Sequence, residues 1–278
     1  MSDSNILVPT DFTPVARIAL EHAVKTAEVI GSKVIILHVV SSAKEVEEAK
    51  AKLANEVEEG KKMNPSIQFD SVIRIGNIFE DIGDAGIELE AELIFMGTHG
   101  AKGWQKIAGS YAMKVITHSE VPFVVVQEKG IKASGYDDIV VPLDLHKETK
   151  QKLTVVGNLA KYFNSKVHII TPKESDEFLL NQLNRNILFA KTYLGEREIE
   201  FTTEVAEKGD FDDAIIEHAE KVDADLIAIM NLAKNSLMGM GLLGSHYEQH
   251  LITNKHKIPV MIVSPAKSSV ASFVSFHG

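Results

Sequence analysis

Short apolar runs and amphipathic stretches alternate along the chain. Residues 5–9 and 138–142 are rich in Ile and Val, as in a buried strand of a parallel sheet. Apolar residues then recur at helical spacing after Thr13 and Pro14, which indicate a helix start, and Gly31 indicates its end. The same reasoning predicts further strands at residues 33–40, 67–73, 93–96 and 122–127, and helices at residues 43–62, 78–89 and about 110–119.

This pattern occurs twice. The segment that ends at Asp11 recurs in the segment that ends at Asp144, an offset of 133 residues, the difference between 144 and 11. Strands that alternate with helices indicate parallel strands joined by right-handed crossovers, which is an α/β fold. We therefore predict two tandem doubly wound domains at residues 1–130 and 135–278. Each has a five-stranded parallel sheet with helices on both faces, and the linker lies at residues 128–136.

Composition narrows the class of protein. The chain has 278 residues, of which 45% are hydrophobic and 24% charged, as in ordinary globular proteins. It has no cysteine, which excludes disulfides and thiolate metal sites. A formal charge of −10 argues against a nucleic-acid partner, because phosphate neutralisation needs a basic surface. The apolar runs are too short for a membrane helix, and the first residues lack a signal-peptide pattern, so we expect a cytoplasmic protein.

Two segments of the first copy meet at one edge of such a sheet. In open parallel sheets, ligands bind beyond the carboxyl ends of the strands, where the strand order reverses. Residues 9–11 follow the first strand, and residues 96–100 follow the fourth. Glycines let consecutive N–H groups converge on an anion, and the next helix start adds free N–H groups. The candidate residues for this phosphate cradle are Pro9, Thr10, Asp11, Met96, Gly97, His99, Gly100, Gly109, Ser110 and Tyr111.

Each of these residues also has a purely structural interpretation. Gly97 and Gly100 then only shape a turn, while Ser110 and Asp11 cap the helices that follow them. His99 either contacts a phosphate or stabilises the turn. The spacing Gly-x2-Gly-x8-Gly-Ser is neither a Walker motif nor a Rossmann fingerprint, so spacing alone is a weak signal.

A known family carries the same motifs. They are Val8-Pro9-Thr10-Asp11, Leu37-His38-Val39, Met96-Gly97-Thr98-His99-Gly100 and Gly109-Ser110, followed by the apolar run at residues 121–126. Together they resemble the universal stress protein family, and because the resemblance spans both copies, the chain is similar to a tandem member. The resemblance implies an adenine-nucleotide alpha hydrolase-like fold. In one subgroup it also implies ATP binding through Gly-x2-Gly-x9-Gly-Ser/Thr, from which this chain departs by one residue in the second gap.

The resemblance also implies roles for single residues. Asp11 contacts the adenosine moiety, and Val39 lines the adenine pocket. The ribose and the phosphates are held by Gly97, Gly100, Gly109 and Ser110. The implied ligand is ATP, or ADP or AMP, bound with Mg²⁺.

The second copy differs at the glycine loop. It keeps Asp144 and Gly244-Ser245, but residues 230–241 contain no Gly-x2-Gly at the matching place. Side chains there obstruct the close backbone approach that a triphosphate needs. We therefore predict a degenerate loop and a structural or regulatory role for the domain at 135–278.

No dedicated catalyst is recognisable. The sequence shows no nucleophile–base pair, so no catalytic residue and no metal ligand are assigned. His246 and His250 stand four residues apart, but Tyr247 occupies the place of the glutamate that a metalloprotease needs. His38, at the end of a strand, is most simply a half-buried histidine with its hydrogen bonds satisfied.

These observations favour a stress-response regulatory protein that binds ATP in its first domain and acts as a switch or partner-binding module. The alternatives are a nucleotide-free interaction module and a slow ATPase. Besides the nucleotide, we expect an unidentified protein partner, and a homodimer or an intramolecular pseudo-dimer through residues 123–127 and 260–264. No membrane contact is expected.

Overall fold

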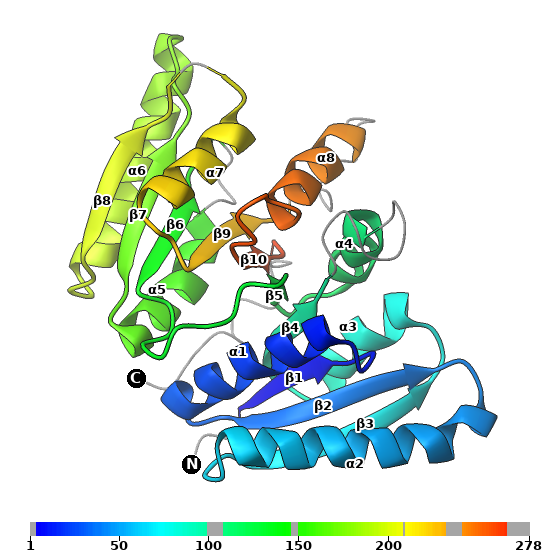
Figure 1. Cartoon of the computed structure of the whole chain (residues 1–278). Coiled ribbons are helices and arrows are strands. Elements are labelled where there is room, and N and C mark those ends of the chain that lie inside the picture. The colour runs from blue at the N-terminus through cyan, green and yellow to red at the C-terminus, as the bar shows by residue number, and fades with distance from the viewer. Residues whose placement is uncertain (1–3, 99–107, 146–149, 208, 232–240, 266–278) are drawn as a thin grey trace. The chain divides into compact units, whose positions relative to one another are not determined.

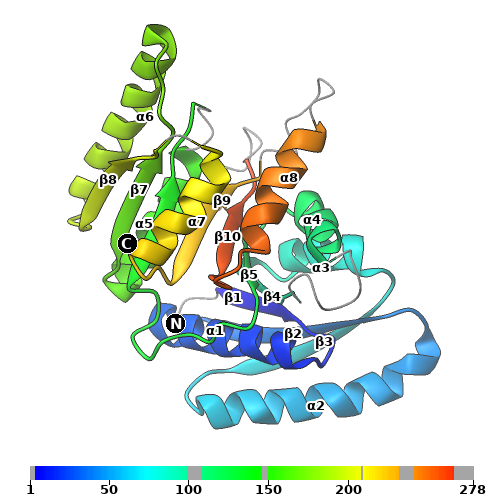
Figure 2. The same ribbon diagram turned by 45° about the horizontal axis from the view of Figure 1, so that its top comes forward.

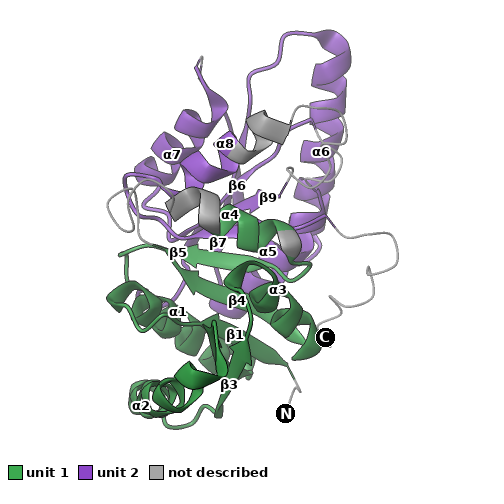
Figure 3. Ribbon diagram, turned by 90° about the vertical axis from the view of Figure 1, so that its right-hand side faces the viewer, with its two compact units in different colours: residues 1–131 green, residues 132–278 purple. Residues whose placement is uncertain are grey.

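The computed structural model describes residues 4–98, 108–145, 150–207, 209–231 and 241–265. The chain divides into two compact units, unit 1 at residues 1–131 and unit 2 at residues 132–278 (Figure 3). Each unit is a parallel sheet with helices, so the predicted α/β fold is confirmed. Among the described residues, no helix has both the length and the apolar character that crossing a bilayer requires.

Unit 1 begins and ends with a strand. Its sheet has the order β3-β2-β1-β4-β5, and every neighbouring pair is parallel (Figure 1). The helices α1 and α2 lie on one face of this sheet and α3 on the other (Figure 3). The elements are β1 (Asn5–Pro9), α1 (Pro14–Ile30), β2 (Lys33–Val40), a short 3-10 helix (Ala43–Glu45), α2 (Val46–Met63), β3 (Phe69–Ile75), α3 (Ile78–Glu88), β4 (Ala91–Gly97), α4 (Ala108–His118) and β5 (Phe123–Val126).

Unit 2 repeats this arrangement. Its sheet has the order β8-β7-β6-β9-β10, again with parallel neighbours. The elements are β6 (Asp138–Pro142), α5 (Gln151–Phe163), β7 (Lys166–Thr171), α6 (Glu177–Gly195), β8 (Phe201–Val205), α7 (Phe211–Lys221), β9 (Leu226–Met230), α8 (Gly241–Ile252) and β10 (Val260–Val263).

Local sequence signals explain where the first helix of each unit starts or stops. The Thr13 side chain accepts a hydrogen bond from the Ala16 N–H and so caps α1, as predicted. Gly31 ends α1 in the left-handed conformation, with φ 78°. Asn164 ends α5 in the same way, with φ 54°, because asparagine tolerates this conformation better than most residues.

Two predicted boundaries differ from the structure. The third strand lies at Phe69–Ile75 instead of 67–73, because the side chain of Asn64 accepts the N–H of Ser66 and holds a turn just before it. The helix expected from about Ser110 begins at Ala108, so Ser110 lies inside the first turn and does not precede it. Ser110 is therefore not the capping residue of that helix.

The sheet order fixes where a ligand can bind in each unit. From β1 the chain moves outward through β2 to β3, and then returns to the other side of β1 with β4 and β5 (Figure 2). The direction therefore reverses between β1 and β4 in unit 1, and between β6 and β9 in unit 2. A crevice forms outside the carboxyl ends of strands at such a reversal.

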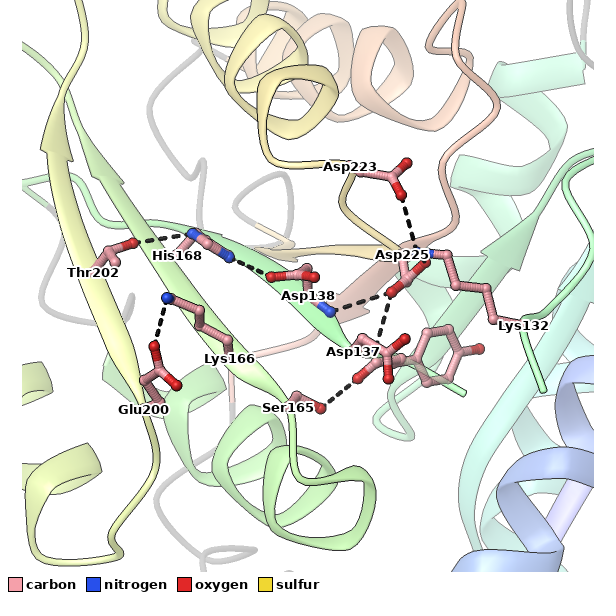
Figure 4. Close-up of polar contacts among 11 residues, drawn as sticks. Lys132, Asp137, Asp138, Ser165, Lys166, His168, Glu200, Thr202, Asp223 and Asp225 are labelled. Atoms are coloured by element: carbon pink, nitrogen blue, oxygen red, sulfur yellow. Dashed lines mark hydrogen bonds and ion pairs between the residues drawn. The ribbon is translucent and has the colours of Figure 1, made fainter. Parts of the chain in front are cut away.

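The start of unit 2 is fixed by a buried carboxylate. Asp225 is 5% exposed and accepts hydrogen bonds from the backbone N–H groups of Asp137 and Asp138, at 2.9 and 3.2 Å (Figure 4). Lys132 neutralises it, with Nζ 2.8 Å from the Asp225 carboxylate, and also reaches Asp223. This pairing, chiefly through the Asp225 hydrogen bond, raises the pKa of Lys132, so the residue stays charged.

Candidate functional site

The loop after β1 is held by hydrogen bonds among its own residues. Thr10 is buried, its N–H donates to the Leu37 carbonyl at 2.8 Å, and its hydroxyl oxygen accepts from the Phe12 N–H at 3.0 Å. Asp11 is exposed, and its Oδ1 accepts from both the N–H and the hydroxyl of Thr13, at 3.1 and 2.6 Å. Asp11 therefore does not cap α1 itself. It orients Thr13, the residue that does.

Two aromatic rings, those of Phe12 and His38, lie close together beside this loop. Phe12 adopts the left-handed conformation, with φ 64°, and its ring centroid is 4.4 Å from that of His38. The Nδ1 of His38 donates to the Thr10 carbonyl at 2.7 Å, so this histidine is half-buried and hydrogen-bonded, as predicted. The Lys52 ammonium lies 5.5 Å from the Phe12 ring centroid. Sequence reasoning missed Phe12, because a positive φ at a bulky residue cannot be inferred from residue type.

Gly97 brings the start of α1 against the end of β4. A Cβ on Gly97 would lie 2.7 Å from the carbonyl carbon and oxygen of Val15 and 2.8 Å from the N of Ala16. These are backbone atoms, so any side chain would push α1 away from the strand. Gly97 therefore has a packing role that holds whether or not a ligand binds. It places the positive end of the α1 dipole at the reversal between β1 and β4.

Other predicted site residues lie around the same edge. Pro9 is the last residue of β1, and Met96 is a buried residue near the end of β4. Val39 is half-buried near the end of β2, where it pairs with Arg74 of β3. Thr98 follows β4, is buried, and donates its N–H to the Val126 carbonyl at 2.8 Å. The carboxyl ends of β1, β2 and β4 thus bring Pro9, Thr10, Asp11, Val39, Met96 and Gly97 to one edge.

The structure describes the rest of the predicted cradle only in part. His99 and Gly100 lie outside the described residues. Gly109, Ser110 and Tyr111 belong to the first turns of α4, while their side chains lie outside the described part of the chain. Because α4 starts at Ala108, its free N–H groups fall in the segment that contains Gly109 and Ser110.

A hollow of about 430 Å³ lies elsewhere in unit 1, between α2 and β3. Val46, Lys50, Leu53, Ile73 and Ile75 are among its lining residues, and none of the predicted site residues is. We place the candidate site at the strand reversal and not here, because ligands of open parallel sheets bind outside the carboxyl ends of the strands at such a reversal.

Unit 2 has a different set of groups at the matching edge. Asn231 follows β9 and is 0% exposed, and its side-chain amide has no hydrogen-bond partner among the residues that the structure describes. Burial raises the pKa of Tyr247 well above its usual value, so this hydroxyl stays neutral. Lys152, of α5, is also buried at this edge. The degenerate loop predicted at residues 230–241 falls mostly outside the described residues.

One histidine of α8, His250, lies close to two acidic side chains. The Nδ1 of His250 lies 2.7 Å from the Asp212 carboxylate, and its Nε2 lies 3.7 Å from that of Asp213. Across the described ranges, no three histidine or acidic side chains are grouped so that they could hold a metal ion.

Comparisons with known proteins agree on one family. The family model described as the universal stress protein family matches residues 4–127 and again residues 135–264. Universal stress protein MJ0577 of Methanocaldococcus jannaschii is 29% identical over 153 residues, which cover 45% of this chain and 94% of that protein.

A solved structure shows the same fold. A universal stress protein from Archaeoglobus fulgidus DSM 4304 aligns with a TM-score of 0.75 at 20% identity, over 96% of this chain and 98% of that chain. A shorter universal stress protein from Archaeoglobus fulgidus, solved in complex with dAMP, is 22% identical. It covers 44% of this chain and 96% of that chain, with a TM-score of 0.38.

Proposed function

The chain belongs to the universal stress protein family, and from that premise we propose that unit 1 binds one adenine nucleotide, ATP, at the strand reversal between β1 and β4. The observation that carries the proposal is the meeting of three features at one edge. These are the Thr10–Asp11 loop, the glycine end of β4, and the start of α1 that Gly97 admits. The motifs at these places are among those by which the sequence resembles the family, one subgroup of which binds ATP.

The nucleotide is held from both ends in this proposal. Asp11 accepts hydrogen bonds from the ribose or adenine, since within the described part of this loop Thr13 bonds to only one of its carboxylate oxygens. Val39 lines the adenine pocket at the end of β2. Backbone N–H groups from Gly97 to Gly100, and at Gly109 and Ser110, receive the phosphates, where helix N-termini favour negative charge. Met96, His99 and Tyr111 flank these groups.

The nucleotide acts as a switch in this proposal. Polyphosphate, with Mg²⁺ as its counter-ion, orders the segment from Gly97 to Ser110, and this changes the surface offered to a protein partner. Assembly of two copies of the chain would present two such surfaces together.

Isothermal titration calorimetry tests the proposal. Wild-type protein is titrated with ATP, ADP and AMP, each with and without Mg²⁺. We expect saturable binding of ATP. In Asp11→Asn, which keeps the oxygen that Thr13 uses but removes the charge, we expect about 10-fold to 100-fold weaker binding, because hydrogen bonds to charged groups contribute about 1.5–3 kcal/mol.

The duplicated chain supplies a matched control. Asp144→Asn makes the same change at the equivalent position of unit 2 and should leave the affinity unchanged. If none of the three nucleotides binds at millimolar concentration, or if Asp144→Asn weakens binding as much as Asp11→Asn, the assignment to unit 1 is wrong.

A further inference from the structure

A buried lysine lies at the strand reversal of unit 2, between β6 and β9. Lys152 is the second residue of α5, is 2% exposed, and donates a hydrogen bond from Nζ to the carbonyl of Pro142, the last residue of β6. At the offset of 133 residues, the matching position in unit 1 is Ala19, which is 0% exposed. At this position of the first helix, one unit thus carries a methyl group, and the other an ammonium that reaches the end of β6.

This lysine is costly to the fold. Burial lowers the pKa of Lys152 to about 8, because an ammonium loses its hydration there. The residue also lies in the first turn of a helix, where the dipole disfavours positive charge. Burial and the helix dipole both disfavour the Lys152 ammonium. The presence of a lysine at this position therefore needs an explanation other than stability.

Two further side chains secure the same loop. The Asn186 amide, 3% exposed, donates to the Asp144 carbonyl at 2.8 Å, and the Gln182 amide donates to the Leu145 carbonyl at 2.5 Å. Both residues lie on α6. Together with Lys152, they fix three carbonyl groups within the four residues 142–145, which begin with the last residue of β6.

The matching loop of unit 1 is less restrained. Its only side-chain bond to a carbonyl in the described part of residues 9–12 comes from His38 of β2, to Thr10. No side chain of α1 or α2 donates to these carbonyls within that described segment. The two copies therefore differ in one respect. In unit 2, side chains of α5 and α6 donate hydrogen bonds to the loop carbonyls, whereas in the described part of unit 1 those of α1 and α2 do not.

We propose that Lys152, Gln182 and Asn186 close the strand reversal of unit 2 against nucleotides, so that the chain takes a single nucleotide, in unit 1. Lys152 fills the space beside the β6 end and commits its ammonium to a carbonyl, and α6 prevents the loop from moving aside. The three residues are specificity determinants that act by occupying the backbone groups of the crevice. This inference rests on the proposed function of unit 1.

The decisive experiment exchanges the residues that differ between the copies. Ala19→Lys places the lysine of unit 2 in unit 1, and Ala19→Met is a control that adds similar length without an ammonium. Titration with Mg·ATP should give one site in the wild type. Ala19→Lys should weaken binding at least about 10-fold, the equivalent of one hydrogen bond at about 1.4 kcal/mol. Ala19→Met should weaken it less. Urea unfolding of both variants checks that each is folded before it is titrated.

A second measurement needs no nucleotide. Hydrogen exchange followed by mass spectrometry compares the wild type with Lys152→Ala, which carries the residue of unit 1. The amides of residues 143–145 should exchange about 10-fold faster in the variant if the bond from Lys152 to the Pro142 carbonyl stabilises the loop by the free energy of one hydrogen bond. In Ala19→Lys, the amides of residues 10–12 should exchange more slowly than in the wild type.

The outcomes separate the two proposals. Two ATP molecules per wild-type chain, unchanged affinity in Ala19→Lys, or unchanged exchange at residues 143–145 in Lys152→Ala would each overturn the closure of unit 2. Equal effects of Ala19→Lys and Ala19→Met would overturn the role of the carbonyl bond. Absence of any ATP binding refutes the proposed function instead, and the exchange measurement still decides whether Lys152 fixes the loop.

Discussion

His22 couples the stability of unit 1 to pH. It lies on α1, is 1% exposed, and its Nε2 donates to the Lys129 carbonyl at 3.0 Å, so it holds the segment after β5 against the helix. Burial lowers the pKa of His22 from 6.5 to about 4, against a smaller opposing effect of that backbone bond. The imidazole is therefore neutral in the folded protein at physiological pH.

The sign and size of the effect follow from this shift. The folded pKa is below the unfolded one, so the unfolded chain takes up the proton first as the pH falls. The stabilisation from neutral His22 is complete above pH 6.5 and is lost as the pH falls toward 4. At pH 5 the free energy of unfolding should have fallen by about 2 kcal/mol on account of this residue, and by about 3.4 kcal/mol below pH 4.

The assay compares the wild type with His22→Gln, which keeps an N–H donor for Lys129 but does not titrate. Urea unfolding is followed by far-UV circular dichroism at pH 7.5 and 5.0, and hydrogen exchange of α1 assigns the transition of unit 1. Other titrating groups, including His218, whose pKa burial also lowers, are common to both proteins. We expect the wild type to lose about 2 kcal/mol more than the variant. Equal losses in the two proteins would refute the reasoning.

Two further predictions concern packing and buried charge. Gly97→Ala should destabilise unit 1 by about 1–3 kcal/mol and weaken nucleotide binding, because the new methyl meets the Val15 backbone. Gly130→Ala, at a glycine with open space around it, is the control in the same urea titration. Asp225→Ala should destabilise unit 2 by about 1–3 kcal/mol, because two backbone N–H groups lose their acceptor. Unfolding midpoints equal to that of the wild type would contradict either prediction.

Much of the fold was predictable from local signals. Thr13, Pro14 and Gly31 delimit α1 because capping and left-handed endings depend on the residue itself. The buried strands β1 and β6 were predicted at their observed bounds, since uninterrupted apolar runs occur where both faces of a sheet are covered. The strand at 69–75 was misplaced by two residues, because an edge strand that is only partly buried has a weaker apolar pattern.

The candidate site was predictable only in part. Sequence order and the strand reversal brought Thr10, Asp11 and Gly97 together. The reason for a glycine at position 97 was not visible, since it lies in a contact with the α1 backbone. Nothing in the sequence distinguished Lys152 from an exposed lysine, because its burial depends on how α5 lies on β6. Such contacts are properties of packing between elements, which periodicity does not encode.

The carboxylate at the start of unit 2 bears on how the protein should be divided for study. The family match of the second half opens at residue 135, whereas Asp225 draws its counter-charge from Lys132, three residues earlier. A recombinant fragment cut at residue 135 would bury an acid beside two backbone amides with no cation to balance it. A fragment of the carboxy-terminal half should therefore begin before Lys132, so that it keeps the ion pair between Lys132 and Asp225.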